Sequence, residues 1–273
     1  MLPKLGILAG GGVLPIRLMQ ACIEAGRPYF VIAIENQTDP DSLDDHPHTW
    51  VRLGAVGKAI DVLKNENVEE LVMIGPVRRP SLIALRPDAW LAKRIVKTGF
   101  MSLGDDGILS NLIAELEAEG FRVIGPEVVL TELVASEGVY GSITPDEIAV
   151  ADIDRGFNVA RGLGSFDVGQ AVVVQQGLVL AVEAIEGTDA MLSRAGELHR
   201  EGPGGILVKV KKPDQEQRVD LPTIGVNTVE KAAAAGLRGI AIQAGHAFIV
   251  DREEVVRLAD QKGLFITGIT INE

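Results

Sequence analysis

The distribution of apolar residues along the first half of the chain is typical of alternating strands and helices. Short apolar runs end at glycine or polar residues and are followed by segments whose apolar residues recur at helical spacing. Such alternation indicates a parallel, doubly wound sheet. The expected strands are residues 5–8, 29–34, 70–74 and 122–124, and the expected helices are residues 14–25, 56–64 and 111–118.

The pattern changes near residue 133, and this change divides the chain. Residues 133–145 are rich in Gly, Ser, Thr and Pro and predict an inter-domain linker. Beyond it, strands are expected at 170–174, 178–185, 205–210, 239–242 and 247–250, with helices at 152–163, 228–235 and 252–262. The sequence therefore predicts an α/β fold of two domains: an N-terminal Rossmann-like domain with a parallel sheet (1–132) and a C-terminal α/β catalytic domain with a mixed sheet (146–273).

The amino-acid composition agrees with this fold and reduces the classes of partner that the protein is expected to bind. Hydrophobic residues make up 47% of the chain and aromatic residues only 4%, so the core is built from aliphatic side chains. The net charge of -12 argues against nucleic acid as a partner, because phosphate binding needs a basic face. The single cysteine, Cys22, favours a reducing compartment. Neither a signal peptide nor a spanning segment is apparent, so we expect a cytoplasmic protein whose membrane contact is peripheral.

Three consecutive glycines, Gly10, Gly11 and Gly12, follow the first expected strand and precede a helix. Backbone N–H groups in such a turn, together with the positive end of the helix dipole, can bind a phosphate. Glu35, at the end of the second strand, stands where an acid could bind a ribose. The spacing is not that of the dinucleotide fingerprint, and a tight turn of any α/β fold is an equal alternative.

Two pairs of charged residues follow in the first domain. Arg78 and Arg79 come after the third strand, at the sheet edge where ligands bind, and their guanidinium groups suit a diphosphate. Asp105 and Asp106 precede a helix and could hold a divalent cation or sugar hydroxyls. Taken alone, a solvated surface pair and helix capping are the favoured interpretations.

Residues 81–100 form a basic, amphipathic segment in an otherwise acidic chain. Lys93, Arg94 and Lys97 alternate with apolar residues. An ordinary packed helix with a charged outer face is the favoured interpretation. The alternative is a face that contacts a bilayer or acyl chains.

Acidic residues cluster after the strand expected at 178–185. Glu186 and Asp189, with Thr188 between them, could meet around one cation after a sharp turn at Gly187. Glu183 and Glu186 need not share a face, so both cannot be assigned to the same site. The clustering exceeds what helix capping requires, and a functional site is therefore favoured.

Cations, carboxylates and amides alternate between Lys209 and Pro222. Strand-like alternation would place Arg218 and Asp220 on one side, with Glu216 two residues earlier. The cations would neutralise a diphosphate, while a carboxylate could bind Mg²⁺ or orient an attacking water. An exposed hairpin with a charged face is the alternative.

Taken in order, these residues resemble the LpxI family, the UDP-2,3-diacylglucosamine pyrophosphatases of lipid A biosynthesis. The shared motifs span nearly the whole chain: AGGGxLP at 9–15, VRRP at 77–80, GDD at 104–106, DVGQ at 167–170, VEAIEGTDAML at 182–192 and KPDQEQRVDLPTIG at 212–225. Glu216 departs from the family pattern, which has Asp at that position, so a carboxylate is retained with a longer reach.

The resemblance implies hydrolysis of UDP-2,3-diacylglucosamine to UMP and 2,3-diacylglucosamine 1-phosphate (lipid X), with Mg²⁺ or Mn²⁺ as cofactor. It implies Asp220 as the catalytic and metal-binding acid, with Glu186 and Asp189 as further metal ligands. Substrate contacts are implied for Gly10, Gly11, Gly12, Arg79, Asp105, Asp106, Gln170, Thr188, Lys211, Gln215 and Arg218. The resemblance is also compatible with peripheral contact at the inner face of the inner membrane and with a homodimer.

Two other classes of function stay open at the level of sequence. A nicotinamide-dependent oxidoreductase would use the N-terminal glycines and Glu35, although no acid–base pair suited to hydride transfer accompanies them. A non-catalytic carrier of a nucleotide or lipid would bind the same UDP-lipid without turnover, and replacement of Asp220 would then have no effect on activity.

Overall fold

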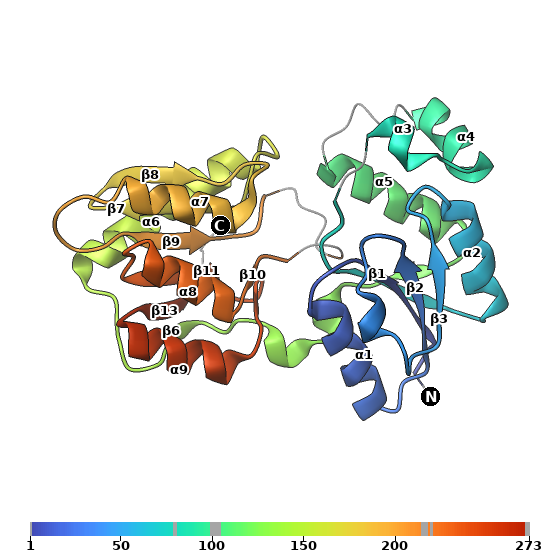
Figure 1. The fold of residues 1–273 in the computed structure, drawn as a ribbon, viewed down its shortest axis with the longest axis horizontal. Helices are drawn as coiled ribbons and strands as arrows, with labels where there is room; N and C mark the ends of the chain where they lie inside the picture. Colours follow the sequence, from blue (N-terminus) through green and yellow to red (C-terminus); the bar gives the residue numbers. More distant parts are fainter. Residues whose placement is uncertain (1, 79–80, 99–104, 214–217, 219–220, 271–273) are drawn as a thin grey trace. The chain divides into compact units, whose positions relative to one another are not determined.

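The structure is a computed structural model that describes residues 2–78, 81–98, 105–213, 218 and 221–270 (Figure 1). The chain forms two compact units. Unit 1 comprises Met1–Thr131 and Glu216–Asp220, and unit 2 comprises Glu132–Gln215 and Leu221–Glu273. Unit 1 is therefore assembled from two separate parts of the chain.

Unit 1 contains a five-stranded parallel sheet in the order β3-β2-β1-β4-β5. Its strands are β1 (Leu5–Ala9), β2 (Tyr29–Ile34), β3 (His48–Val51), β4 (Glu70–Ile74) and β5 (Arg122–Val123). Its helices are α1 (Leu14–Glu24), α2 (Val56–Asn65), α3 (Leu82–Leu85), α4 (Ala89–Thr98) and α5 (Asp105–Ala118), with short 3-10 turns at Pro40–Ser42 and Pro126–Val128.

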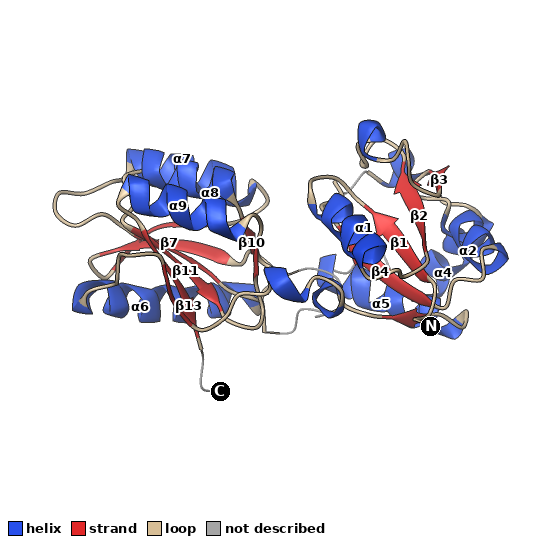
Figure 2. Ribbon diagram, turned by 90° about the horizontal axis from the view of Figure 1, so that it is seen from below, coloured by secondary structure: helices blue, strands red, loops and turns tan. Residues whose placement is uncertain are grey.

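Helices cover both faces of this sheet (Figure 2). Successive side chains of a strand point to opposite faces, so a strand buried on both faces reads as a continuous apolar run, as β2 does. On one face Phe30 and Ile32 pack with Leu63 of α2 and Leu116 of α5. On the other face lies α1, which buries Pro15, Leu18, Met19 and Cys22.

Unit 2 is built around a six-stranded mixed sheet in the order β6-β13-β11-β9-β7-β8. Strands β9, β11 and β13 run parallel, while β6, β7 and β8 are antiparallel to the strands they adjoin. The strands are β6 (Gly138–Tyr140), β7 (Ala171–Gln175), β8 (Leu178–Val182), β9 (Ile206–Lys209), β11 (Gly239–Gln243) and β13 (Phe265–Ile269). A small parallel pair, β10 (Thr223–Ile224) and β12 (Phe248–Ile249), accompanies it.

Four helices cover the mixed sheet in two layers (Figure 2). They are α6 (Glu147–Gly164), α7 (Gly187–Glu197), α8 (Val226–Ala234) and α9 (Arg252–Lys262), and a 3-10 turn at Thr131–Leu133 spans the start of the unit. The α7, α8 and α9 layer encloses one apolar cluster against the sheet. The α6 layer encloses a second cluster against the opposite face, so the sheet is buried on both sides.

The predicted fold class is confirmed, because a parallel sheet in one unit and a mixed sheet in the other are both present. Several elements differ from expectation. Strand β6 lies inside the segment expected to be a linker, and its three residues are mostly exposed, so no apolar run marks it. Helix α7 is not among the expected helices, since Gly187 and Gly196 lower its helix propensity.

Candidate functional site

The ends of several strands meet at one edge of the unit 2 sheet, which we call the carboxyl edge. Lys209, the last residue of β9, pairs with Ala171 at the start of β7 and with Ile242 near the end of β11. Val182, the last residue of β8, pairs with Val172. Residues that follow β8, β9 and β11 therefore gather beside those that precede β7, where ligands bind in many α/β proteins.

A buried polar group occupies the carboxyl edge. Thr188, in the first turn of α7, donates a hydrogen bond to Glu183 Oε1 at 2.5 Å and accepts one from Lys209 Nζ at 3.0 Å. Lys209 also donates to the carbonyl oxygen of Thr223 at 3.1 Å, and the N–H of Gln170 donates to Glu183 Oε2 at 3.2 Å. Glu183 and Lys209 are only 7% and 8% exposed, so these charges depend on protein partners rather than water.

The two acids predicted to share a cation have different partners. Glu186 accepts a hydrogen bond from Arg194 at 2.6 Å, and Arg194 also donates to the carbonyl oxygen of Val182. The backbone N–H of Glu186 and the Arg194 guanidinium hold the pKa of Glu186 below its ordinary value. Asp189 accepts from Asn227 at 2.8 Å.

Carboxylate oxygens are the donors that Mg²⁺ prefers. In the part of the chain that the structure describes, no group of three or more His, Cys, Asp or Glu side chains is arranged to hold a metal ion. Asp220, the acid on which the predicted metal site depends, lies outside the described residues.

Two other predicted substrate ligands lie at the carboxyl edge. The side-chain oxygen Oε1 of Gln170 is buried and has no hydrogen-bond partner among the described residues. Such an orphaned acceptor is costly unless a ligand or water satisfies it. Lys211 follows β9, and its backbone N–H donates to Gln243 Oε1 at 3.0 Å at the end of β11. The structure thus gathers Gln170, Thr188 and Lys211 at one edge.

The glycine turn of unit 1 lies where the strand order reverses between β1 and β4. Gly10 donates its N–H to the carbonyl of Ile74 at 2.8 Å, and Gly11 donates to Pro76 at 2.9 Å. A Cβ added to Gly10 would lie 2.5 Å from the carbonyl oxygen of Gly75. These glycines therefore bring two backbone segments together. Two of the three N–H groups predicted to bind phosphate already donate to backbone carbonyl groups.

The remaining predicted site residues belong to unit 1 or lie outside the described residues. Arg218 belongs to unit 1, where its guanidinium donates to Glu117 of α5 at 2.6 Å. Asp105 and Asp106 were expected to precede a helix, and instead they are the first residues of α5. Arg79, Gln215, Glu216 and Asp220 lie outside the described residues.

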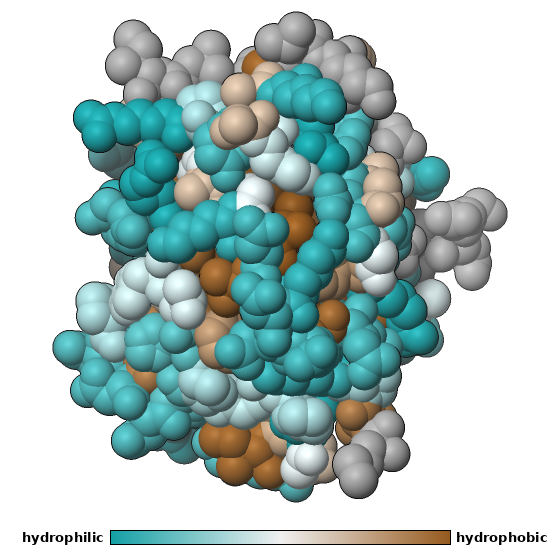
Figure 3. Space-filling model, turned by 90° about the vertical axis from the view of Figure 1, so that its right-hand side faces the viewer, coloured by the Kyte–Doolittle hydropathy of each residue, from teal (hydrophilic) through white to brown (hydrophobic). Residues whose placement is uncertain are grey.

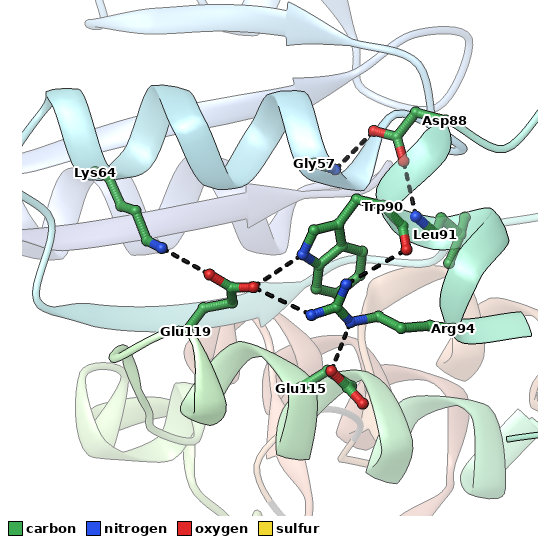
Figure 4. Close-up of polar contacts among 8 residues, drawn as sticks. All are labelled: Gly57, Lys64, Asp88, Trp90, Leu91, Arg94, Glu115 and Glu119. Carbon is green, nitrogen blue, oxygen red and sulfur yellow. Dashed lines mark hydrogen bonds and ion pairs between the residues drawn. The ribbon is translucent and has the colours of Figure 1, made fainter. Parts of the chain in front are cut away.

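The basic segment at 81–100 contributes α3 and α4, and one of its cations is committed to the fold (Figure 4). The Arg94 guanidinium lies 3.4 Å from the centre of the Trp90 ring and donates to Glu115 and Glu119. Asp88 accepts from the N–H groups of Gly57 and Leu91, so one carboxylate caps both α2 and α4. Arg94 therefore anchors α4 within unit 1.

The surface near this segment is mixed in character. In the space-filling view of Figure 3, hydrophilic residues dominate the coloured area and hydrophobic ones appear in small separate areas. Lys93 is exposed. The exposure of Lys93 and the ion pairs of Arg94 agree with an ordinary packed helix with a charged outer face.

Sequence reasoning did not select two residues at the centre of the buried polar group, Lys209 and Glu183. Lys209 ends the run Ile206–Lys209, in which every residue is buried. The available signal was a lysine directly after the apolar strand residues Ile206, Leu207 and Val208, since lysine is almost never fully buried unless it is paired. Glu183, directly after β8, is also buried, but β8 itself is partly exposed and gives no such signal.

The fold and this site define a class: a two-unit α/β protein with a buried, hydrogen-bonded polar group at the carboxyl edge of a mixed sheet. Comparison with known families assigns it more closely. The chain matches the LpxI N-terminal domain over residues 4–133 and the LpxI C-terminal domain over residues 136–267. The chain belongs to the LpxI family.

One curated relative and one solved structure illustrate how far the similarity extends. The UDP-2,3-diacylglucosamine pyrophosphatase LpxI of Caulobacter vibrioides is 44% identical over 277 residues, covering 99% of each chain. The solved structure of CobK precorrin-6A reductase shares 14% identity with a TM-score of 0.33, covering 100% of this chain and 89% of that one. A TM-score this low supports no conclusion about fold or function. Among the described residues, no helix has the length and hydropathy needed to cross a membrane.

Proposed function

We propose that the protein hydrolyses the diphosphate of UDP-2,3-diacylglucosamine to UMP and lipid X. The observation that carries this proposal is the 44% identity to the Caulobacter vibrioides pyrophosphatase over 99% of both chains. The aligned residues cover both units of the chain. The proposal therefore rests on the full chain rather than on one motif.

The carboxyl edge offers groups that suit this substrate. Lys209, Lys211 and Arg194 bring positive charge to a region that also contains Glu183 and Glu186. Cations near a diphosphate stabilise the charge that develops as the bond between phosphorus and bridging oxygen breaks. The orphaned Gln170 acceptor supports a role in binding a hydroxyl or N–H group of the substrate, because binding would satisfy it.

Asp220 is our choice for the essential acid, with Glu186 and Asp189 as further metal ligands. This assignment rests on the family motifs at 182–192 and 212–225. Mg²⁺, or Mn²⁺ in its place, would neutralise the diphosphate and help to lower the pKa of an attacking water. In this scheme Arg79, Lys211 and the glycine turn bind the diphosphate. Asp105, Asp106, Gln215 and Arg218 contact the rest of the substrate.

We further propose that the protein works in the cytoplasm in peripheral contact with the inner membrane, because its substrate carries two acyl chains. A homodimer is part of the same proposal. Sedimentation of the protein with vesicles, and its mass in solution, test these two points separately from the chemistry.

The decisive experiment measures UMP release from UDP-2,3-diacylglucosamine with Mg²⁺, with Mn²⁺ and with EDTA. We expect metal-dependent release, and a loss of about 10³-fold or more in kcat for Asp220→Asn, which keeps the size of the side chain and removes its charge. An active Asp220→Asn protein would contradict the residue assignment and leave the reaction standing. Tight binding of the UDP-lipid without UMP release would instead favour a carrier.

A further inference from the structure

Two loops at the carboxyl edge of unit 2 expose large apolar side chains. Phe166 and Val168 lie in residues 165–170, between α6 and β7, and are 81% and 42% exposed. Ile185 lies in residues 183–186, between β8 and α7, and is fully exposed. In the part of the chain that the structure describes, Ile185 and Phe166 are the most exposed large apolar residues. We call Phe166, Val168 and Ile185 the apolar tips.

The two loops lie side by side. Pairing of β7 with β8 continues beyond the strands, since the N–H of Glu183 donates to the carbonyl oxygen of Ala171 at 2.8 Å. The N–H of Gln170 donates to Glu183 Oε2 at 3.2 Å, and a Cβ added to Gly169 would lie 2.1 Å from the carbonyl oxygen of Glu183. The apolar tips therefore belong to one region of the surface, which adjoins the buried polar group. Single apolar residues are ordinary on a protein surface, whereas a group of them indicates an interaction surface.

Hydrogen bonds hold the first loop in the conformation that exposes its apolar residues. Phe166 and Val168 both donate their N–H groups to the carbonyl oxygen of Leu163, at 3.1 and 3.3 Å. The N–H of Asp167, which lies between them, donates to the carbonyl oxygen of Gly164 at 2.9 Å. The exposure of Phe166 is thus a property of a hydrogen-bonded turn at the end of α6.

The charged side chains of the two loops all have partners within unit 2. Asp167 pairs with Lys212, and Glu186 accepts a hydrogen bond from Arg194 at 2.6 Å. Glu183 is only 7% exposed and belongs to the buried polar group. An unpaired charge is costly to bring next to hydrocarbon, and pairing reduces that cost. The surroundings of the apolar tips therefore suit an apolar medium better than a charged protein partner.

We propose that the apolar tips insert into the hydrocarbon layer of a lipid bilayer and dock the carboxyl edge on the membrane. This inference rests on the proposed function, since that substrate carries two acyl chains and its diphosphate is assigned to the carboxyl edge. Side chains that project from loops suit a deformable bilayer, whereas a single acyl chain is bound best in a concave pocket. The basic segment at 81–100 is therefore not the docking surface.

The test measures sedimentation with phosphatidylcholine vesicles. Phe166→Ser and Ile185→Ser are compared with Leu178→Ser, a control at a 46% exposed residue at the opposite end of β8 from Ile185. We expect each variant of the apolar tips to weaken vesicle binding about 10-fold, because an apolar side chain no longer leaves water. The double variant should lose about 100-fold, since the two losses are independent. Phe166→Leu should bind almost as well as wild type, and Leu178→Ser should be unchanged.

The salt dependence separates this surface from a basic one. Binding through the apolar tips should persist when the NaCl concentration rises from about 0.1 M to about 1 M, because the screening that weakens surface electrostatics does not weaken apolar insertion. Addition of phosphatidylglycerol should not strengthen it. Vesicle binding that falls in Lys93→Glu and stays unchanged in both serine variants would overturn the proposal and assign the contact to the segment at 81–100.

A fluorescence measurement reports insertion directly. Brominated phosphatidylcholine should quench the added tryptophan of Phe166→Trp and of Ile185→Trp, and should not quench that of Leu178→Trp. The native Trp50 and Trp90 are common to all three variants and provide the background. Equal quenching in the three variants would contradict insertion of the apolar tips.

Other occupants of this surface give different results. A dimer of the lipid-free protein that dissociates in Phe166→Ser would overturn the proposal and assign the apolar tips to a second copy of the chain. Wild-type protein that does not bind vesicles would also overturn it.

The docking surface and the proposed function fail separately. Vesicle binding needs no turnover, so it decides the docking surface even if wild-type protein releases no UMP and the proposed function is rejected. UMP release from detergent-dispersed substrate supports the proposed function, and vesicle binding that is equal in wild type and both serine variants then rejects the docking surface alone.

Discussion

Glu119, just beyond α5, accepts hydrogen bonds from three side chains of unit 1 (Figure 4). Lys64 donates at 2.7 Å, Trp90 Nε1 at 2.9 Å and Arg94 at 3.1 Å. The hydrogen bond from Lys64, followed by that from Trp90, holds the pKa of Glu119 below its ordinary value of 4.5. The folded state therefore favours the charged carboxylate more than the unfolded chain does.

A pH-dependent loss of stability follows from this lowered pKa. The contribution of Glu119 is fully present above its ordinary pKa and is lost as the pH falls through the lowered folded value. We expect Glu119→Gln to lower the free energy of unfolding by about 1 kcal/mol at pH 7, because the carboxylate is partly exposed. Urea unfolding at pH 7 and at pH 3 checks this. A difference that persists unchanged at pH 3 would rule out the carboxylate charge as its source.

Cys22 is fully buried in α1, and burial raises the pKa of its thiol to about 11, outweighing the opposite influence of Arg27. The thiolate is the reactive form. We therefore expect Cys22 not to react with a thiol reagent at pH 8 in the folded protein, and to react at once in denaturant. Labelling followed by absorbance measures both states. Rapid labelling of the folded protein would show that α1 opens.

At the scale of elements, one buried acid sets the turn between β7 and β8. Asp152 of α6 is 2% exposed and accepts the N–H groups of Gln176 at 2.8 Å and Gly177 at 2.6 Å. Both turn residues have positive φ, 51° and 76°, which is the conformation of a type I′ hairpin turn. A helix thus holds a strained hairpin through two charge-assisted hydrogen bonds.

Replacement of Asp152 by alanine should destabilise the hairpin. The N–H groups of Gln176 and Gly177 would lose a buried, charged acceptor, so we expect a loss of about 2–3 kcal/mol in the free energy of unfolding. Denaturant unfolding measures it, with Asp154→Ala, an exposed acid of the same helix, as the matched control. Equal stability of the two variants would mean that water replaces the lost acceptor.

The sequence predicts those elements whose pattern of apolar residues identifies them without information from distant parts of the chain. Helix α9 occupies the predicted residues 252–262, since Gly263 in the left-handed region ends it. Strand β13 was not predicted, because Gly268 interrupts its apolar run. That glycine is required where the chain approaches the carbonyl oxygen of Ser136, and this neighbour is distant in sequence. Local patterns carry no information on such approaches.

The sequence predicted the motifs that contribute to the candidate site, but not how their side chains are arranged. The acidic motif drew attention to Thr188, yet its partners Glu183 and Lys209 depend on the register of β7, β8 and β9. Register across antiparallel and parallel neighbours is fixed by tertiary packing. A sequence read from end to end therefore identifies the types of residue at the carboxyl edge better than their contacts.

At the scale of the whole molecule, Arg218 is the described residue of the second chain segment of unit 1, Glu216–Asp220. It is proposed as a substrate contact, whereas the structure pairs it with Glu117. We expect Arg218→Glu to lower kcat/KM at least about 10-fold, because a cation proposed to contact the anionic substrate becomes an anion. The double variant Glu117→Arg with Arg218→Glu separates the two roles in the UMP assay. Recovery of activity would assign Arg218 to the ion pair with Glu117, and no recovery would assign it to substrate.

The division of unit 1 between Met1–Thr131 and Glu216–Asp220 has a consequence for biosynthesis. Ribosomes add about 5–20 residues per second, so the second part emerges on the order of ten seconds after the first. During that interval the nascent unit 1 lacks Arg218, the partner of Glu117, while most of unit 2 is still being translated. Completion of the N-terminal unit is therefore coupled to synthesis of the C-terminal one, and a ribosome that stalls between them leaves both unfinished.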